Sequence, residues 1–240
     1  MKISIAIPAR WASTRLPQKL LLDLAGHPVL YHTWQQASSV SHIAEIVILA
    51  DHEAIAESAK SFGANVWMTD PRCSSGTERI ASVADRFAGD FIINVQGDEP
   101  FIDTQLLATI ANDAQQGNSD IITAAYRISE LPDLINPNRV KVVLNHRQEA
   151  LYFSRSPIPF VRDVAQANWL SGATFWGHIG IYGYSKNFLK DFHNLPKGKL
   201  SEYEKLEQLQ FLEAGHRIRV LEATQPTLGI DTPEDLERAR

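Results

Sequence analysis

The sequence predicts an α/β protein with a mostly parallel sheet, and two observations carry this prediction. Short apolar runs, typical of buried strands, alternate along the chain with segments of helical periodicity. Such alternation favours right-handed strand–helix–strand units whose strands share one sheet. The second observation is size: 240 residues, 44% of them hydrophobic, are enough to bury one large core. We therefore expect a single domain over residues 1–240.

Five runs between Ile3 and Tyr126 are interpreted as strands. They are Ile3–Ile7, Glu45–Ala50, Asn65–Met68, Phe91–Val95 and Ile121–Tyr126. Helical patterns lie between them, beginning at Pro28 and covering 53–61, Ile80–Phe87 and Asp103–Gly117.

The second half has a different pattern, richer in strands. The runs Arg139–Leu144 and Ala150–Ser154 flank a polar turn and predict a β-hairpin. A long connection follows, and long connections inside domains are usually functional or form interfaces. The remaining expected elements are a strand over His178–Tyr184, one helix from a capping box at Ser201 to Gly215, a strand over Arg217–Leu221 and a last helix capped by Thr232.

Composition excludes several classes of protein. A formal charge of −5 argues against nucleic acid or an anionic membrane as a general partner. The single cysteine, Cys73, excludes an intramolecular disulfide and a cysteine-based zinc site. The apolar run that follows Met1 and Lys2 is too short for a signal peptide or a membrane span. We expect a soluble, cytoplasmic protein.

A basic loop follows the first strand. It places three cations, Arg10, Arg15 and Lys19, within ten residues and separates them by small side chains. Guanidinium and ammonium groups of this kind suit a polyphosphate, and ligands of open α/β sheets collect at the carboxyl ends of strands. The loop matches neither common glycine-rich phosphate motif. The alternative is a solvated basic loop without a ligand.

Two further turns carry candidate chemistry. The turn Cys73–Arg79 opens a helix, and its amides suit a base or a phosphate, although the residues alone favour a simple Ser or Thr cap. Asp98 follows a buried strand between Gly97 and Pro100, a good position for a Mg²⁺ ligand or for an ordinary turn residue.

At this point the sequence resembles a known family. The string PARWASTRLPQK resembles the signature of the sugar cytidylyltransferases, in particular of the 3-deoxy-manno-octulosonate (Kdo) cytidylyltransferases. The segments SSGTER, NVQGDEP, ALYFSR, HIGIYGY and DTPEDLERAR match the same family in order, so the resemblance spans the whole chain. It implies a Rossmann-like nucleotidyltransferase fold similar to GT-A, with a smaller, β-rich insert at about 130–200 that covers the sugar and makes a dimer contact.

The resemblance also implies a reaction and a set of site residues. CMP would pass from CTP to the sugar acid with release of pyrophosphate, for lipopolysaccharide synthesis, and Mg²⁺ would be the cofactor. The implied catalytic residues are Arg10, Arg15, Lys19 and Asp98. The implied CTP-binding residues are Pro8, Ala9, Arg10, Lys19, Ser74, Ser75 and Gly76, and the metal ligands are Asp98 and Asp231. The implied sugar-binding residues are Arg79, Gln96, Arg155, His178, Tyr182, Glu207 and Gln208.

Departures from the family pattern leave the exact substrate open. Gln18, Leu20 and the pair Cys73-Ser74 differ from the residues that are usual in the family. A second candidate sugar is therefore 8-amino-3,8-dideoxy-manno-octulosonate, although sequence drift is the favoured explanation, because none of the differences adds a charge that would pair with a new substrate group. A CMP-sialate synthetase, a sugar-1-phosphate nucleotidyltransferase and a non-catalytic nucleotide-binding module would share parts of the same pattern. We expect a homodimer.

Overall fold

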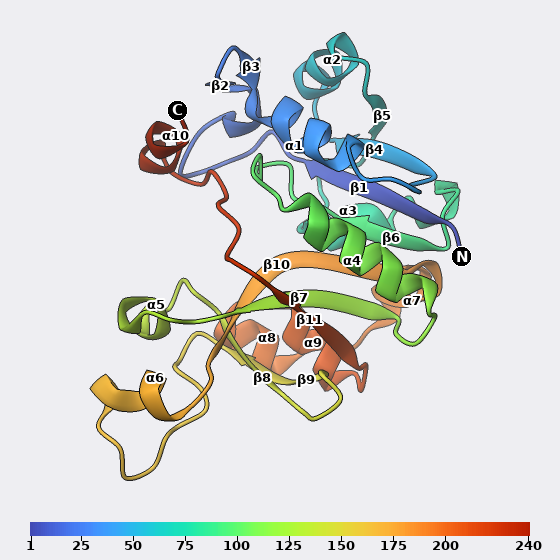
Figure 1. Cartoon of the computed structure of the whole chain (residues 1–240). Coiled ribbons are helices and arrows are strands. Elements are labelled where there is room, and N and C mark those ends of the chain that lie inside the picture. The colour runs from blue at the N-terminus through green and yellow to red at the C-terminus, as the bar shows by residue number, and fades with distance from the viewer. The chain divides into compact units, whose positions relative to one another are not determined.

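The computed structural model describes all 240 residues and divides into two units. The first unit comprises Met1–Asn118, Ile181–His193 and Thr227–Arg240, and the second comprises Ser119–Gly180 and Asn194–Pro226. Each unit is therefore assembled from segments that are far apart in the sequence (Figure 1).

The sheet of the first unit is built around β1 (Ile3–Ala9). This strand pairs in parallel with β4 (Glu45–Ala50) on one side and with β6 (Phe91–Asn94) on the other. β5 (Asn65–Met68) extends the sheet in parallel beyond β4, and the end of β10 (Trp176–Ser185) pairs antiparallel with β6. All seven residues of β1 are buried, as expected for a strand that is covered on both faces. The strands predicted for this region are confirmed.

Helices cover this sheet, and most were predicted. The α-helices of the first unit are α1 (Val29–Ser38), α2 (Glu53–Ser61), α3 (Gly76–Ala81), α4 (Thr104–Gln115), α7 (Lys186–Asp191) and α10 (Pro233–Ala239). Of these, α1 and α4 pack against each other, and α3 packs against β1 and β6 (Figure 1). A small hairpin of β2 (Asp23–Leu24) and β3 (His27–Pro28) precedes α1.

The prediction of a helix over Ile80–Phe87 was wrong. The helix begins earlier, at Gly76, because the Ser75 side chain accepts a hydrogen bond from the backbone N–H of Glu78 and so starts the first turn. It ends at Ala81, and a short 3₁₀ helix over Ala84–Arg86 follows. The predicted boundary at Ile80 therefore lies inside a capped helix, and the predicted end at Phe87 follows a separate 3₁₀ helix.

The second unit contains the remaining strands. β7 (Ile121–Arg127) and β11 (Ile218–Ala223) pair in parallel, and β7 lies next to β10. The predicted hairpin is confirmed as β8 (Lys141–Leu144) and β9 (Ala150–Ser154), which pair antiparallel. Two short helices, α5 (Leu131–Ile135) and α6 (Trp169–Gly172), belong to this unit. Most of the insert predicted at about 130–200 falls here, together with β7 and β11.

The single helix predicted from Ser201 to Gly215 was also wrong, because two helices occupy this segment. They are α8 (Lys199–Glu204) and α9 (Glu207–Glu213), separated where Lys205 takes a left-handed conformation with φ 53°. The carboxylate of Glu213 accepts hydrogen bonds from the first backbone N–H groups of α8, including that of Lys199 at 3.0 Å. This distant carboxylate replaces the local capping box that the sequence indicated.

Across the whole chain, no helix combines the length and the apolar character that crossing a membrane requires.

Candidate functional site

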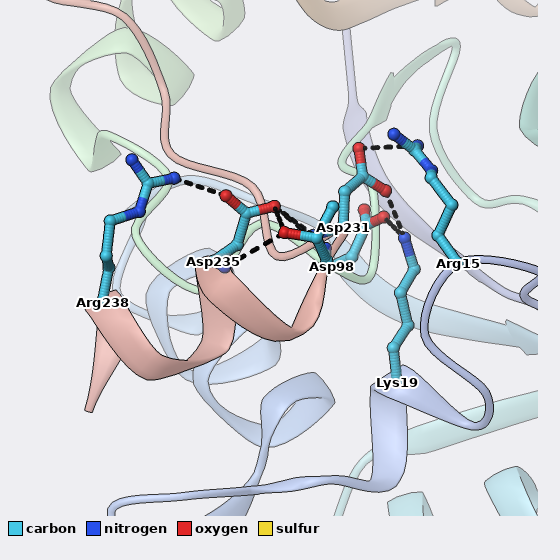
Figure 2. A network of polar contacts seen from close by, with 7 residues as sticks. Arg15, Lys19, Asp98, Asp231, Asp235 and Arg238 are labelled. Atoms are coloured by element: carbon cyan, nitrogen blue, oxygen red, sulfur yellow. Dashed lines mark hydrogen bonds and ion pairs between the residues drawn. The ribbon is translucent and has the colours of Figure 1, made fainter.

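The two carboxylates predicted to bind metal meet two cations of the basic loop in one cluster of the first unit. The ammonium group of Lys19 pairs with the carboxylate of Asp98 and lies 2.8 Å from Oδ1 of Asp231. A guanidinium nitrogen of Arg15 lies 3.0 Å from Oδ2 of Asp231. Figure 2 shows both carboxylates turned toward the Lys19 ammonium. Lys19 is buried, whereas the side chain of Asp231 is 46% exposed, so the cluster is open to solvent on the Asp231 side.

Two long-range interactions bring Asp231 to Asp98. The backbone N–H of Ile230 donates a hydrogen bond of 2.8 Å to the carbonyl oxygen of Asp98. Ile230 is also fully buried in an apolar cluster that includes Leu16 of the basic loop and Leu236 of α10. Burial of these side chains holds the loop and α10 together, so that residues distant in sequence share one site.

The start of α10 fixes the backbone at Asp231. The predicted Thr232 cap is confirmed, and Asp235 completes a capping box with it. Oδ2 of Asp235 accepts the backbone N–H of Thr232 at 2.9 Å and that of Asp231 at 3.1 Å. Arg238 pairs with the other oxygen of Asp235 (Figure 2). The carboxylate of Asp231 is thus held by a preformed helix start.

The donor set of this cluster fits a divalent cation. Asp98 and Asp231 converge on a single positive group, the Lys19 ammonium, which lies between oxygen donors of the kind that Mg²⁺ prefers. Glu99 is different, because burial and the neighbouring Asp98 charge raise its pKa to about 8. Glu99 therefore carries a proton near neutral pH, in contrast to a metal ligand.

A cavity of about 280 Å³ lies beside this cluster. Its lining residues come from the basic loop, the turn before α3 and the turn after β6, and they are Pro8, Arg10, Lys19, Leu20, Cys73, Ser74, Ser75, Gly76, Arg79, Gln96, Gly97 and Asp98. Every predicted CTP-binding residue except Ala9 lines it. A Cβ atom at Gly97 would lie 3.0 Å from the carbonyl oxygen of Pro8, a closer contact than is usual, which favours glycine at this position.

The turn Cys73–Gly76 caps a helix and also lines the cavity, whereas its binding of a base or a phosphate stays a prediction. Ser75 caps α3, and the carboxylate of Glu78 accepts the N–H and the hydroxyl of Ser74 at 2.6 Å each. These bonds to Ser74 lower the pKa of Glu78. The same turn lines the cavity, so the capping interactions fix its position on one wall of the pocket.

Arg79 and Gln96, both predicted to bind the sugar, also line the cavity. Arg79 forms a buried ion pair with Asp51 at 3.0 Å and donates to the Thr69 hydroxyl at 2.7 Å. Its guanidinium is thus largely engaged within the protein. The side-chain amide of Gln96 donates to Oδ1 of Asn94 at 3.2 Å and remains half-buried at the cavity.

Arg155, in the second unit, is engaged by backbone carbonyls. It donates to the carbonyl oxygens of Glu204 at 2.7 Å, Pro137 at 3.0 Å and Lys205 at 3.4 Å. The carboxylate of Glu204 accepts the backbone N–H of Arg155 at 2.9 Å. Arg155 therefore binds the end of α8, and the fork that was expected to hold a sugar carboxylate is mostly used in this arrangement.

His178 is partly buried, and desolvation of its ring lowers its pKa to about 3. Its Nε2 lies 3.0 Å from the hydroxyl of Thr123, and the ring of Phe153 packs edge-on against it. At neutral pH His178 is uncharged, so it can offer a carboxylate a hydrogen bond but no positive charge.

The other predicted sugar-binding residues lie in both units. Glu207 is the first residue of α9, and Gln208 beside it is buried with its Nε2 lacking a hydrogen-bond partner. Tyr182 belongs to the first unit, where its ring stacks on that of Tyr184. The contribution of these residues to sugar binding stays a prediction.

Several residues that organise the site were not predicted from the sequence. Leu16 and Ile230 hold the loop and Asp231 together, and Asp51 and Asp235 fix backbone positions beside the candidate residues. A signal was available for Asp51, since an acidic residue directly follows a buried strand there, as Asp98 follows another. No local pattern marks Leu16 or Ile230 as contacts of each other.

Comparisons with known proteins identify the family of this chain. A sequence model of the cytidylyltransferase family matches residues 4–218. The 3-deoxy-manno-octulosonate cytidylyltransferase of Geobacter sulfurreducens is 42% identical over 99% of this chain and 98% of its own length. The enzyme of the same name from Actinobacillus pleuropneumoniae is 40% identical over 100% of this chain and 98% of its own.

A solved structure is also similar over the full length. It is described as CMP:2-keto-3-deoxy-manno-octonic acid synthetase complexed with CTP, and it superposes with a TM-score of 0.93 at 37% identity. The match covers 99% of this chain and 96% of that one, which confirms the predicted fold. None of these relatives favours an 8-amino sugar, a sialate or a non-catalytic module. The chain belongs to the 3-deoxy-manno-octulosonate cytidylyltransferase family and is a nucleotidyltransferase.

Proposed function

We propose that this protein transfers CMP from CTP to the anomeric hydroxyl of Kdo and releases pyrophosphate, as a step of lipopolysaccharide synthesis. One observation carries the proposal: two carboxylates and two loop cations converge beside a cavity lined by nearly all of the predicted CTP-binding residues. The family of the chain supports the same reaction, as does its similarity to a synthetase whose structure was solved with CTP.

The basic loop would bind the triphosphate of CTP. A nucleoside triphosphate carries about four negative charges at neutral pH, and guanidinium and ammonium groups are its usual protein partners. Arg10 and Lys19 line the cavity, and Arg15 lies at the Asp231 side of the cluster. Catalysis in such a displacement is mainly positioning and neutralisation of the charge that develops on the leaving pyrophosphate.

Asp98 and Asp231 would hold the divalent cation, which we propose to be Mg²⁺. When bound, it would supply charge neutralisation at the phosphates. Lys19 pairs with the same two carboxylates, so its ammonium and a divalent cation compete for their oxygens. Release from the carboxylates would leave the Lys19 ammonium free to bind the triphosphate.

The nucleotide base would lie along the turn Ser74–Gly76, whose position is fixed by Ser75 and Glu78. For the sugar we retain the predicted residues Arg79, Gln96, Arg155, His178, Tyr182, Glu207 and Gln208. Among them Gln96 has the most accessible polar group at the cavity, and His178 would act as a neutral hydrogen-bonding group. A homodimer and a cytoplasmic location are also part of the proposal.

The direct test is release of pyrophosphate from CTP by the purified protein. We expect release that requires both Kdo and Mg²⁺, is abolished by EDTA and is restored by added Mg²⁺. Equal release without Kdo would contradict the transfer, and no release with Kdo would contradict the proposed substrate. Replacement of Kdo by N-acetylneuraminate or by the 8-amino sugar at equal concentration compares kcat/KM among the three acids.

A further inference from the structure

A buried ion pair at the edge of the cavity connects two of the cavity's walls. The pair is Asp51 with Arg79, whose side chains are only 7% and 3% exposed and whose charged atoms are 3.0 Å apart. Asp51 directly follows β4, at the same end of the sheet at which β1 runs into the basic loop. The Asp51 side chain is absent from the cavity lining, so it does not touch a ligand there.

Each oxygen of the Asp51 carboxylate binds a different segment. Oδ1 accepts the backbone N–H of Trp11 at 2.7 Å, which fixes the basic loop one residue after Arg10. Oδ2 accepts a guanidinium N–H of Arg79, which lies in α3. The other end of the Arg79 guanidinium donates to the hydroxyl of Thr69 and, at 3.2 Å, to the carbonyl oxygen of Asp70.

A second contact fixes the loop at the same point. The ring of Trp11 stacks on that of His52, with centroids 4.0 Å apart and planes inclined by 14°. His52 also caps α2, since its Nδ1 accepts the backbone N–H of Ala54. The loop is thus held from one side by its backbone and from the other by an aromatic ring.

We propose that Asp51 is a positioning residue of the CTP pocket. Its carboxylate sets the distance between the Arg10 wall and the Cys73–Gly76 wall, because it binds the backbone beside the first and the guanidinium that anchors the second. A carboxylate that only balanced the Arg79 charge would need no bond to Trp11. Misplacement of a binding group by about 1 Å can cost up to about 100-fold in rate, so a fixed separation of the walls matters.

The test is the affinity for CTP, measured by calorimetry in the presence of Mg²⁺ and without sugar, so that no turnover occurs. The inference rests on the proposed function, because it concerns the CTP site. For Asp51→Asn, which keeps the shape but loses the charge, we expect CTP to bind about 10-fold more weakly. In steady-state assays at saturating Kdo the KM for CTP rises by a similar factor.

Two further variants separate positioning from general loss of stability. Ser4→Ala removes a buried hydroxyl that bonds Glu45 and Gly89 at the opposite end of β1, and we expect it to lower stability with unchanged CTP affinity. His52→Asn removes the ring under Trp11 but retains a side chain that caps helices well, and we expect about 3-fold weaker CTP binding. If Asp51→Asn does not fold, the CTP affinity of His52→Asn tests whether the position of the loop at Trp11 matters for CTP binding.

The outcomes are distinct. Wild-type affinity in folded Asp51→Asn overturns the inference, as does unchanged affinity in His52→Asn or weakened binding in Ser4→Ala equal to that in Asp51→Asn. Each of these leaves the proposed function standing. Failure of the unmodified protein to bind CTP overturns both proposals at once.

Discussion

Each unit of the molecule buries a lysine, and the two lysines have opposite surroundings. Lys19 in the first unit meets two carboxylates from different segments, and these carboxylates are partly exposed. Lys141 in the second unit is fully buried and donates to three backbone carbonyls, those of Asn136, Arg139 and Arg155, at 2.6–3.0 Å. Burial lowers the pKa of Lys141.

These surroundings make the Lys19 ammonium a cation that a ligand can displace from its partners and the Lys141 ammonium a structural one. The partners of Lys19 are charged side chains that another cation or a phosphate can compete for. The partners of Lys141 are neutral carbonyls of its own unit, which would be left without a donor if the ammonium moved. A buried lysine therefore indicates function when charged side chains surround it, and indicates stability when backbone carbonyls do.

The largest expected effect concerns the two carboxylates. Asp98→Asn and Asp231→Asn should each lower the Mg²⁺-dependent rate by about 10³-fold or more, because a bound metal contributes several kcal/mol of charge stabilisation. The rate of pyrophosphate release at saturating CTP and Kdo measures this loss of activity. Asp103→Asn is a matched control, because Asp103 caps α4 and asparagine caps equally well. A full rate in either variant at limiting Mg²⁺ would contradict the assignment of both carboxylates.

The next effect tests the exchangeable lysine. Lys19→Met should lower kcat by about 10²- to 10³-fold, the cost of removing one preorganised charge that acts on developing phosphate charge. Circular dichroism should show an intact fold, since the residue lies in a loop with only a short 3₁₀ turn. An unchanged turnover number would remove Lys19 from the mechanism.

The matched substitution at the structural lysine should have the converse result. Lys141→Met leaves three buried carbonyls without their donor and should lower the free energy of unfolding by about 2–4 kcal/mol. Denaturant titration measures this loss. Affinity for CTP, at a temperature where the variant is folded, should be unchanged. A stable Lys141→Met variant with weak CTP binding would contradict the contrast between the two lysines.

The smallest effect is a pH dependence from His178. Its pKa falls from the ordinary 6.5 to about 3, so between these values the unfolded chain binds a proton that the folded chain does not. The contribution of His178 to the free energy of unfolding is therefore fully present above about pH 6.5 and is lost as the pH falls toward 3. From pH 7 to pH 5 the loss should be about 2 kcal/mol.

Comparison of variants isolates this contribution from other titrating groups. In His178→Gln the part of the pH dependence due to His178 should disappear, whereas His146→Gln, at an exposed turn position, should behave like the unmodified protein. Unfolding curves at both pH values give the difference. Identical slopes in all three proteins would show that His178 titrates normally in the folded state.

Local patterns in the sequence were sufficient for most elements of the fold. The apolar runs predicted β1, β4, β6 and β7 because buried strands need continuous apolar residues. The hairpin and the Thr232 cap were predicted for similarly local reasons. The basic loop and the position of Asp98 beyond a strand could be assigned on the same basis, together with the family resemblance.

Other features were decided only by tertiary contacts. The start of α8 is capped by the carboxylate of Glu213, 14 residues along the chain from Lys199, and the helix ends where Lys205 takes a left-handed conformation. The engagement of Arg155 by carbonyls depends on Glu204 and Pro137, neither of which is a sequence neighbour. Local periodicity carries no information about such partners, so the sequence overestimated both the length of one helix and the freedom of one arginine.

The meeting of Asp98 and Asp231 is the clearest case. The sequence by itself determined that each carboxylate lies at the end of an element, because the buried strand before Asp98 and the Thr232-Pro233 helix start after Asp231 are local signals. Only the tertiary structure decided that they converge. The backbone hydrogen bond from Ile230 to Asp98 and the burial of Ile230 against Leu16 bring the two carboxylates together. Both contacts join segments that no periodic pattern connects.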